Sequence, residues 1–253
     1  MRIVCKFGGT SMATPTSIRQ VASILKANPY RKVGVVSAPG RINFAEKVTD
    51  LLIQRRLDEV MERLQQICVG LSLTRCFVQV LERELYKRTH EDEILAFGEY
   101  ASARILALVT GKLFVDATDI ISFRGNEVVV NEDPLNHMCG VIVPGFYGLD
   151  TETKQIRTFS RGGSDISGAH IAAELNADLY ENWTDVSGVY SQDPNLHKTA
   201  MRYEYLRYHE LATIVSEGAT VFHPQAIFPV LKKHIPVMIR NTFFPHEIGT
   251  LIF

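Results

Sequence analysis

The sequence is poor in the residues that mark secreted and membrane proteins. Its 253 residues hold four cysteines that form no C-x-x-C pair: Cys5, Cys68, Cys76 and Cys139. We therefore expect reduced thiols in a cytoplasmic protein rather than a disulfide framework. No apolar run approaches the length that spans a bilayer, and the chain reaches a polar glycine loop after a few residues. We expect neither a membrane segment nor a signal peptide.

An excess of charge is also missing. The 27 basic and 28 acidic residues give a formal net charge of −1, so nucleic acid and anionic lipid are not expected partners. The eight histidines include no H-x-x-x-H or H-E-x-x-H spacing, which argues against a zinc hydrolase. No G-x-G-x-x-G is present, so a dinucleotide enzyme is not supported.

Short apolar runs alternate with helical patterns, which predicts an α/β fold with a mainly parallel sheet. Thr14 reads as the cap of a helix that starts at Pro15. Longer helical patterns predict one helix over 45–71 and another over 92–109. Strands are expected at 2–7, 32–38, 112–117, 141–146, 177–184, 235–242 and 249–253. No Gly/Ser/Pro-rich linker occurs, so we expect any two lobes to share one sheet.

The first stretch that suggests chemistry is CKFGGTSMA, residues 5–13. A strand, a glycine pair and then a helix present backbone N–H groups and a positive helix end to an anion. Lys6 would place its charge over the same position. A Walker loop has its lysine after the glycines, whereas here the lysine comes first. On this stretch alone, a plain Gly-Gly turn explains the residues equally well.

The second stretch is Ser160-Arg161-Gly162-Gly163-Ser164-Asp165, where a further helix should begin. The glycines allow close backbone approach, and Arg161 suits a two-pronged grip on a carboxylate. Asp165 can hold either Lys6 or Mg²⁺. A plain N-cap at Ser164 or Asp165 is the simpler alternative, but it does not require the residues before it. The two glycine loops together favour a phosphoryl-transfer site.

Two further features are weaker signals. The segment WTDVSGVY, residues 183–190, ends a strand in Thr184 and Asp185 and places Tyr190 shortly after. Ligands bind at this edge of open α/β sheets, but an Asx-type turn explains the segment better when it is taken alone. Glu99 lies in an otherwise apolar helix and needs a partner if it points inward.

Taken together, these stretches resemble the aspartokinases of the amino-acid kinase superfamily. KFGGTS, VVSAPG, GEYAS, PGFYG, FSRGGSD, ENWTDVSGVYSQDP and GATVFHP occur in the order found in that family, and the resemblance runs from residue 2 to residue 253. It implies an open three-layer α/β/α sandwich, with an amino-acid-binding lobe over about 1–150 and a nucleotide-binding lobe over about 151–253. The implied reaction is phosphorylation of the side-chain carboxylate of L-aspartate by ATP with Mg²⁺, in lysine, threonine and methionine biosynthesis. A homodimer is also implied.

The resemblance also implies roles for individual residues. Lys6 stabilises the transferring phosphoryl group, with Asp165 at the catalytic centre. The nucleotide site comprises Gly8, Gly9, Thr10, Ser11, Thr184, Asp185, Tyr190 and Asp193. The acceptor site comprises Ser37, Asn43, Glu99, Phe146, Arg161, Gly162 and Ser164. Within it, Glu99 holds the α-amine and Arg161 the α-carboxylate; no residue is assigned as a dedicated metal ligand.

The sequence departs from the family pattern in three places. Asn195 and Thr220 stand where many aspartokinases have an arginine and a lysine that reach the phosphates, and Arg202 or Lys198 is a possible substitute. Asn43 stands where many have a threonine. The chain ends one residue after GTLI, where relatives continue into ACT domains. We expect no inhibition by lysine or threonine through a site of its own, which titration of both into an activity assay would check.

Two alternatives stay open. A kinase of another small carboxylate or a phosphonate would use the same fold, since fold does not fix substrate. The combination of Glu99 and Arg161 favours an α-amino acid, because it matches one cationic and one anionic group. A non-catalytic regulatory homologue is the other alternative. The residues Asn195 and Thr220 motivate it, and retention of both Lys6 and Asp165 argues against it.

Overall fold

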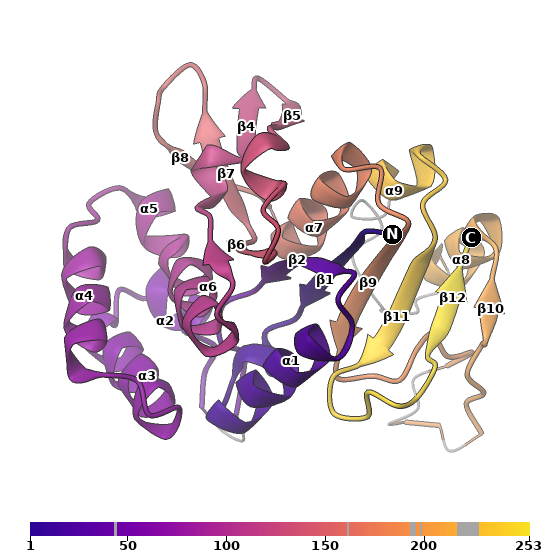
Figure 1. Cartoon of the computed structure of the whole chain (residues 1–253), viewed down its shortest axis with the longest axis horizontal. Helices are drawn as coiled ribbons and strands as arrows, with labels where there is room; N and C mark the ends of the chain where they lie inside the picture. The colour runs from indigo at the N-terminus through magenta and orange to yellow at the C-terminus, as the bar shows by residue number, and fades with distance from the viewer. Residues whose placement is uncertain (43–44, 161, 193–195, 198, 217–227) are drawn as a thin grey trace.

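The computed structural model describes residues 1–253 apart from 43–44, 161, 193–195, 198 and 217–227 (Figure 1). Eight strands form the main sheet, in the spatial order β10 (Tyr205–Leu206), β12 (Thr250–Ile252), β11 (Val237–Asn241), β9 (Leu179–Thr184), β1 (Ile3–Phe7), β2 (Arg31–Val36), β6 (Val141–Pro144) and β3 (Leu113–Phe114). Only the β11–β12 pair is antiparallel among the described neighbours in this sheet. The predicted mainly parallel sheet is confirmed.

Helices cover both faces of the main sheet. On one face lie α1 (Pro15–Ala27) and α6 (Phe97–Thr110). Four further helices of the first half extend the same core beyond α1 and α6: α2 (Val48–Ile53), α3 (Leu57–Gly70), α4 (Arg75–Tyr86) and α5 (Glu91–Leu95). Those of the second half pack on the other: α7 (Gly163–Glu174), α8 (Tyr208–Ser216) and α9 (Phe228–Lys232). The sandwich is therefore three-layered, as predicted. No described helix has the length and apolar character needed to cross a membrane.

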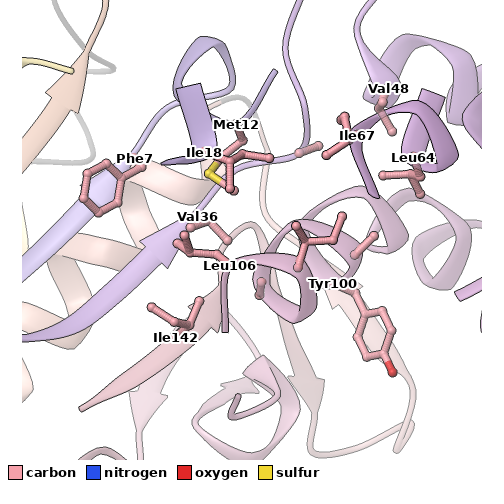
Figure 2. Packing of buried hydrophobic residues seen from close by; sticks show 14 of the residues in the cluster. Phe7, Met12, Ile18, Val36, Val48, Leu64, Ile67, Tyr100, Leu106 and Ile142 are labelled. Carbon is pink, nitrogen blue, oxygen red and sulfur yellow. The ribbon is translucent and has the colours of Figure 1, made fainter. Parts of the chain in front are cut away.

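The side chains of β1 alternate between the two faces because successive residues of a strand point in opposite directions. Ile3, Cys5 and Phe7 belong to the core under α1 and α6, whereas Val4 belongs to the core under α7. Figure 2 shows part of the first core, in which strand and helix residues belong to one cluster: Phe7, Val36 and Ile142 from the strands, and Ile18 and Leu106 from the helices. This alternation places Lys6 on the α7 face.

The start of α1 forms as predicted. The Thr14 hydroxyl accepts from the Ser17 N–H, and the Ser17 side chain accepts from the Thr14 N–H, which makes a capping box with Pro15 at the first helical position. Ile18 and Val21 face the core. The cap begins the helix directly after the turn Thr10–Met12 (η1), so that turn is held between strand and helix.

Two predicted helices are each divided in the structure, and two features were not predicted. The single helix expected over 45–71 is two helices, because Arg55 adopts a left-handed φ of 58° between α2 and α3. The helix expected over 92–109 is divided at Ala96 into α5 and α6. Helix α4 was not expected, nor was a second sheet of β5 (Glu127–Val130), β4 (Ile121–Arg124), β7 (Tyr147–Asp150) and β8 (Ile156–Thr158), at the top of Figure 1.

A buried charged cluster joins the four central strands β11, β9, β1 and β2. The Glu181 carboxylate accepts from Arg31 Nε at 2.8 Å and Nη2 at 3.0 Å, from Trp183 Nε1 at 2.9 Å and from Arg240 Nη1 at 3.4 Å. The Cys5 thiol donates to it at 3.3 Å. Burial alone raises the pKa of Glu181, but the hydrogen bonds and charge of Arg31, with Trp183 and Arg240, hold it below its ordinary value.

Replacing Glu181 by alanine should lower the free energy of unfolding by about 3–5 kcal/mol, because it leaves the buried Arg31 guanidinium without its carboxylate. Urea denaturation followed by far-UV circular dichroism measures this. The wild-type contribution is present above about pH 4.5 and is lost as the pH falls through the lower folded-state pKa. The control Glu84→Ala removes the partly exposed pair with Lys87 and should change stability by less than about 1 kcal/mol. Equal losses in the two variants would contradict the account.

Candidate active site

A cavity of about 910 Å³ lies at the carboxyl ends of four neighbouring strands of the main sheet. Gly8 follows β1, Ser37 follows β2, Phe146 comes shortly after β6, and Thr184 ends β9; all four residues line the cavity. Ligands of parallel α/β sheets bind at this edge. The cavity is therefore the candidate active site.

A buried ion pair forms one wall of this cavity. Lys6 Nζ lies 2.6 Å from Asp165 Oδ1, with the two side chains 8% and 18% exposed. Lys6 reaches Asp165 because it points to the α7 face of β1, and Asp165 lies in the first turn of α7. Asn182 Nδ2 donates to the same oxygen at 3.3 Å. The ammonium group is thereby fixed in a largely water-excluded position, where its field acts strongly.

The loop after β1 presents backbone donors beside Lys6. The Gly8 N–H donates to the Trp183 carbonyl at 3.0 Å. The turn η1 is then closed by a hydrogen bond from the Ser11 N–H to the Gly8 carbonyl at 3.1 Å. Within the described residues, neither the Gly9 N–H nor the Thr10 N–H has a hydrogen-bond partner. Gly8, Gly9 and Thr10 all line the cavity. Free N–H groups at the start of a helical turn bind anions.

The segment Ser37–Gly40 threads between this loop and the start of α6. The Gly40 N–H donates to the Gly9 carbonyl at 2.8 Å, and a Cβ on Gly40 would lie 2.5 Å from the Gly9 carbonyl carbon. On the other side, a Cβ on Gly98 would lie 2.6 Å from the Ala38 Cβ. The absence of side chains at Gly40 and Gly98 therefore lets the Gly8–Thr10 loop and helix α6, which carries Glu99, approach the segment between them closely.

The start of α7 continues the wall that contains Asp165. Gly162 caps the helix with a left-handed φ of 77°, and Gly162, Gly163 and Ser164 line the cavity. Phe146 packs against them in the left-handed region itself, with φ 75°, and its N–H donates to Ser167 Oγ at 3.0 Å. A Cβ on Gly163 would lie 2.6 Å from the Phe146 ring. Such a backbone conformation at a non-glycine residue stores strain, which is typical of functional sites.

Glu99 is the unusual acid of the cavity. Its side chain is buried, it lines the cavity, and within the described residues its Oε2 has no hydrogen-bond partner. Burial raises its pKa to about 8, although hydrogen bonds from the Ala38 and Glu99 backbone N–H groups oppose the shift. A buried carboxyl with a free oxygen is suited to a cationic ligand, which would supply the missing partner.

The structure brings most of the predicted site residues together. The cavity wall contains Lys6, Gly8, Gly9, Thr10, Ser37, Glu99, Phe146, Gly162, Ser164, Asp165 and Thr184. Ser11 is instead fully buried, with its Oγ 2.7 Å from Thr242 Oγ1, and Asp185 and Tyr190 lie beyond the end of β9 without lining the cavity. Asn43, Arg161, Asp193, Lys198, Asn195 and Thr220 lie outside the described residues. Arg202, a proposed substitute for the phosphate contacts, pairs with Glu247 at 3.1 Å.

Sequence reasoning missed several lining residues: Arg41, Lys47, Thr49, Asp50 and Asn182. Thr49 and Asp50 lie in the first turn of α2, and Arg41 and Lys47 precede that helix. The polar residues before VTDLLI could have indicated a loop and a helix start at Val48. The prediction of one uninterrupted helix over 45–71 left no place for that loop.

The described geometry agrees with what sequence comparison finds. The family model of the Amino acid kinase family matches residues 1–241, so the chain belongs to this family. Aspartokinase 3 of Bacillus subtilis (strain 168) is 33% identical over an alignment 287 residues long, gaps included. The alignment covers 98% of this chain and 63% of that protein. Aspartokinase 2 of the same organism is 32% identical, over 99% of this chain and 58% of that protein. The chain thus spans about three fifths of the length of these relatives.

Solved structures share the fold. A crystal structure of Clostridium acetobutylicum aspartate kinase superposes with a TM-score of 0.87 at 34% identity, over 99% of this chain and 62% of that chain. Aspartokinase III of E. coli, in complex with aspartate and ADP, superposes with a TM-score of 0.88 over 100% of this chain and 64% of that chain. Its identity of 24% supports the fold alone. The predicted amino-acid kinase fold is confirmed.

The burial of Glu99 predicts a specific pH dependence of stability. A raised folded-state pKa means that the carboxyl imposes no penalty below pH 4.5, and that stability falls between pH 4.5 and about 8. Relative to Glu99→Gln, the wild type should lose roughly 4 kcal/mol of unfolding free energy between pH 5 and pH 8.5. Denaturant titrations at both pH values measure this. The exposed Glu91→Gln serves as control, and an identical pH response in all three proteins would contradict the account.

Proposed function

We propose that this chain catalyses the ATP-dependent phosphorylation of the side-chain carboxylate of L-aspartate, giving 4-phospho-L-aspartate and ADP. One observation carries the proposal. A single cavity contains the Lys6–Asp165 pair beside a glycine phosphate loop, together with Glu99, a buried carboxyl whose free oxygen suits an amine. Membership of the amino acid kinase family supports it. So do the aspartokinases of B. subtilis and the aspartate kinase of C. acetobutylicum, which are similar along nearly the whole chain.

The acceptor end of the cavity suits an α-amino acid. Glu99 offers a carboxylate oxygen to a cationic amine, and Ser37 and Phe146 line the same region. Arg161 is proposed to grip the α-carboxylate; its neighbours Ser160 and Gly162 line the cavity. An amine and a carboxylate held at two fixed points leave the side-chain carboxylate to face the phosphate loop. This arrangement favours an amino acid over acceptors that lack a free amine.

The phosphate end suits transfer between two anions. The attacking carboxylate is already ionised at neutral pH, so the protein needs no general base. It needs alignment and positive charge instead. That charge comes from Lys6, from the start of α7, and from the N–H groups of Gly9 and Thr10, which no described residue occupies. Preorganised donors of this kind stabilise developing charge without reorganising during the reaction.

Mg²⁺ would accompany the nucleotide, and the residues present fit it. Asp165 offers a carboxylate, and Asn182 Oδ1 is buried without a hydrogen-bond partner within the described residues. Oxygen donors of this kind hold Mg²⁺ together with phosphate oxygens. Bound there, the ion would neutralise charge on the phosphates.

The two halves of the chain are proposed to divide the substrates between them. Residues 1–150 contribute Glu99 and Phe146 at the acceptor end, and residues 151–253 contribute Thr184 at the nucleotide end. Each half also supplies one loop to the other substrate: Gly8–Thr10 to the phosphates, and Gly162–Ser164 to the acceptor. Both halves supply strands to the main sheet, so the site is built across one continuous support. The glycine loops at Gly8 and Gly162 come from different halves and line the same cavity.

A coupled assay of ADP release with Mg-ATP should show turnover with L-aspartate, and hydroxylamine should trap the acyl phosphate as a hydroxamate. Lys6→Met should lower kcat by about 10²–10³-fold, because it removes a fixed charge beside the transferring group. The control Lys26→Met changes an exposed lysine at the end of α1 and should leave turnover unchanged.

The same assay separates the alternatives. Turnover with L-glutamate, N-acetylglutamate or UMP in place of L-aspartate would indicate a related kinase with another acceptor. Binding of nucleotide without ADP release from any acceptor would indicate a non-catalytic homologue. Either result would overturn the proposed activity.

Aspartate binding should also release a proton. At pH 7 the Glu99 carboxyl, with a pKa of about 8, is mostly protonated in the free protein. A bound ammonium group stabilises the carboxylate, so roughly one proton should leave per aspartate bound. Calorimetric titrations in buffers of different ionisation enthalpy count it. Glu99→Gln should release none; equal proton release in the variant and the wild type would show that Glu99 does not hold the amine.

A further inference from the structure

Arg63 is a buried cation that the proposed reaction does not use. It lies on α3, its residue is 8% exposed, and it does not line the active-site cavity. Its Nη2 donates to the Gly40 carbonyl at 2.6 Å, and its Nη1 donates to the Glu46 carbonyl at 3.2 Å. No ion pair joins it to a carboxylate of the described residues. Burying a charge without a carboxylate partner costs free energy, so the two hydrogen bonds to carbonyls are what stabilise the Arg63 guanidinium in this position.

Each of the two carbonyls belongs to the peptide unit that precedes a cationic residue of the cavity. The Gly40 carbonyl is in the Gly40–Arg41 peptide, and the Glu46 carbonyl is in the Glu46–Lys47 peptide. Arg41 and Lys47 are exposed, line the cavity, and have no ion-pair partner within the described part of the chain. One guanidinium therefore fixes the backbone next to two cationic residues of the cavity wall, Arg41 and Lys47.

The planar guanidinium is suited to this task. Its two terminal nitrogens donate in fixed directions, so one side chain can hold two separate peptide units, whereas a lysine ammonium is a flexible point charge. The Gly40 peptide is fixed on its other side as well, since the Gly40 N–H donates to the Gly9 carbonyl of the phosphate loop. Arg63, Gly40 and Gly9 thus form a continuous connection from α3 to the anion-binding loop.

We propose that Arg63 is a positioning residue that orients Arg41 and Lys47 toward the phosphates of the bound nucleotide. This inference rests on the proposed function for the identity of the ligand, but it concerns nucleotide affinity and not the acceptor. Arg41 and Lys47 supply the attraction, and Arg63 acts only through them. The three residues should therefore behave as one energetic unit.

A mutant cycle tests the unit, with the Kd of ADP from calorimetry as the measurement. Arg63→Lys keeps the positive charge but loses the two terminal nitrogens that donate in fixed directions, and it should weaken ADP binding about tenfold. Arg41→Ala/Lys47→Ala should weaken it by a similar factor. The triple variant should be no weaker than the double variant, because groups that act as a unit are not additive. The salt dependence of the Kd should be weaker than in the wild type in all three, because Lys6 is the cationic residue that still faces the phosphates.

Arg19→Lys is the matched control. Arg19 donates to the Gly70 carbonyl at the end of α3, does not line the cavity, and should not change ADP affinity. Independent, multiplying effects of Arg63 and the two cations would overturn the proposal, as would an Arg63→Lys affinity equal to that of the control. Arg41 and Lys47 are exposed, so their variants remain informative if Arg63→Lys unfolds; unchanged ADP affinity in them would also overturn it. Wild-type protein that binds ADP without phosphorylating L-aspartate would refute the proposed activity and leave this cycle valid.

Discussion

The contact between Lys6 and Asp165 is the interaction on which the cavity depends. It joins the centre of the main sheet to the first turn of α7, and it requires that helix to lie close to β1. Gly168 permits the approach, since a Cβ there would lie 3.2 Å from the Lys6 Cβ and 2.6 Å from the Tyr180 hydroxyl. With α7 in this position, its amino end, the phosphate loop and Lys6 all face the same space.

Two buried glutamates show how the molecule separates stability from function. Glu181 is surrounded by donors, and its pKa is lowered despite burial, so it stabilises the four central strands. Glu99 Oε2 has no hydrogen-bond partner among the residues that the structure describes, and burial raises its pKa to about 8. A folded protein tolerates the second arrangement at a cost in stability, and a ligand with a cationic group would remove that cost. The left-handed backbone at Phe146 is a second local cost in the same cavity wall.

Much of the fold could be predicted from local signals. The capping box at Thr14 and Ser17 and the apolar runs of the main strands act over a few residues, and each formed as expected. The predictions failed where the structure depends on a single backbone conformation or on pairing between distant segments. A left-handed Arg55 divides a pattern whose apolar spacing continues across the break. The short strands of the second sheet are stabilised by pairing with one another, which the sequence does not display.

The candidate site was predictable in its chemistry and less so in its geometry. Lys6 and the two glycine loops, taken together, predict an anion-binding site from residue type and order alone. The orientation of Ser11 was not predictable, because its burial against Thr242 depends on a strand more than 200 positions later. Arg63 carries no motif, since only the folded chain shows which carbonyls it holds.

A crystal structure of the protein with ADP and L-aspartate tests the central claim most directly. Both ligands should occupy the one cavity, with the aspartate amine within hydrogen-bond distance of Glu99 and its side-chain carboxylate facing Lys6 and the Gly8–Thr10 loop. Aspartate bound with its amine away from Glu99, or the two ligands bound in separate cavities, would contradict the account.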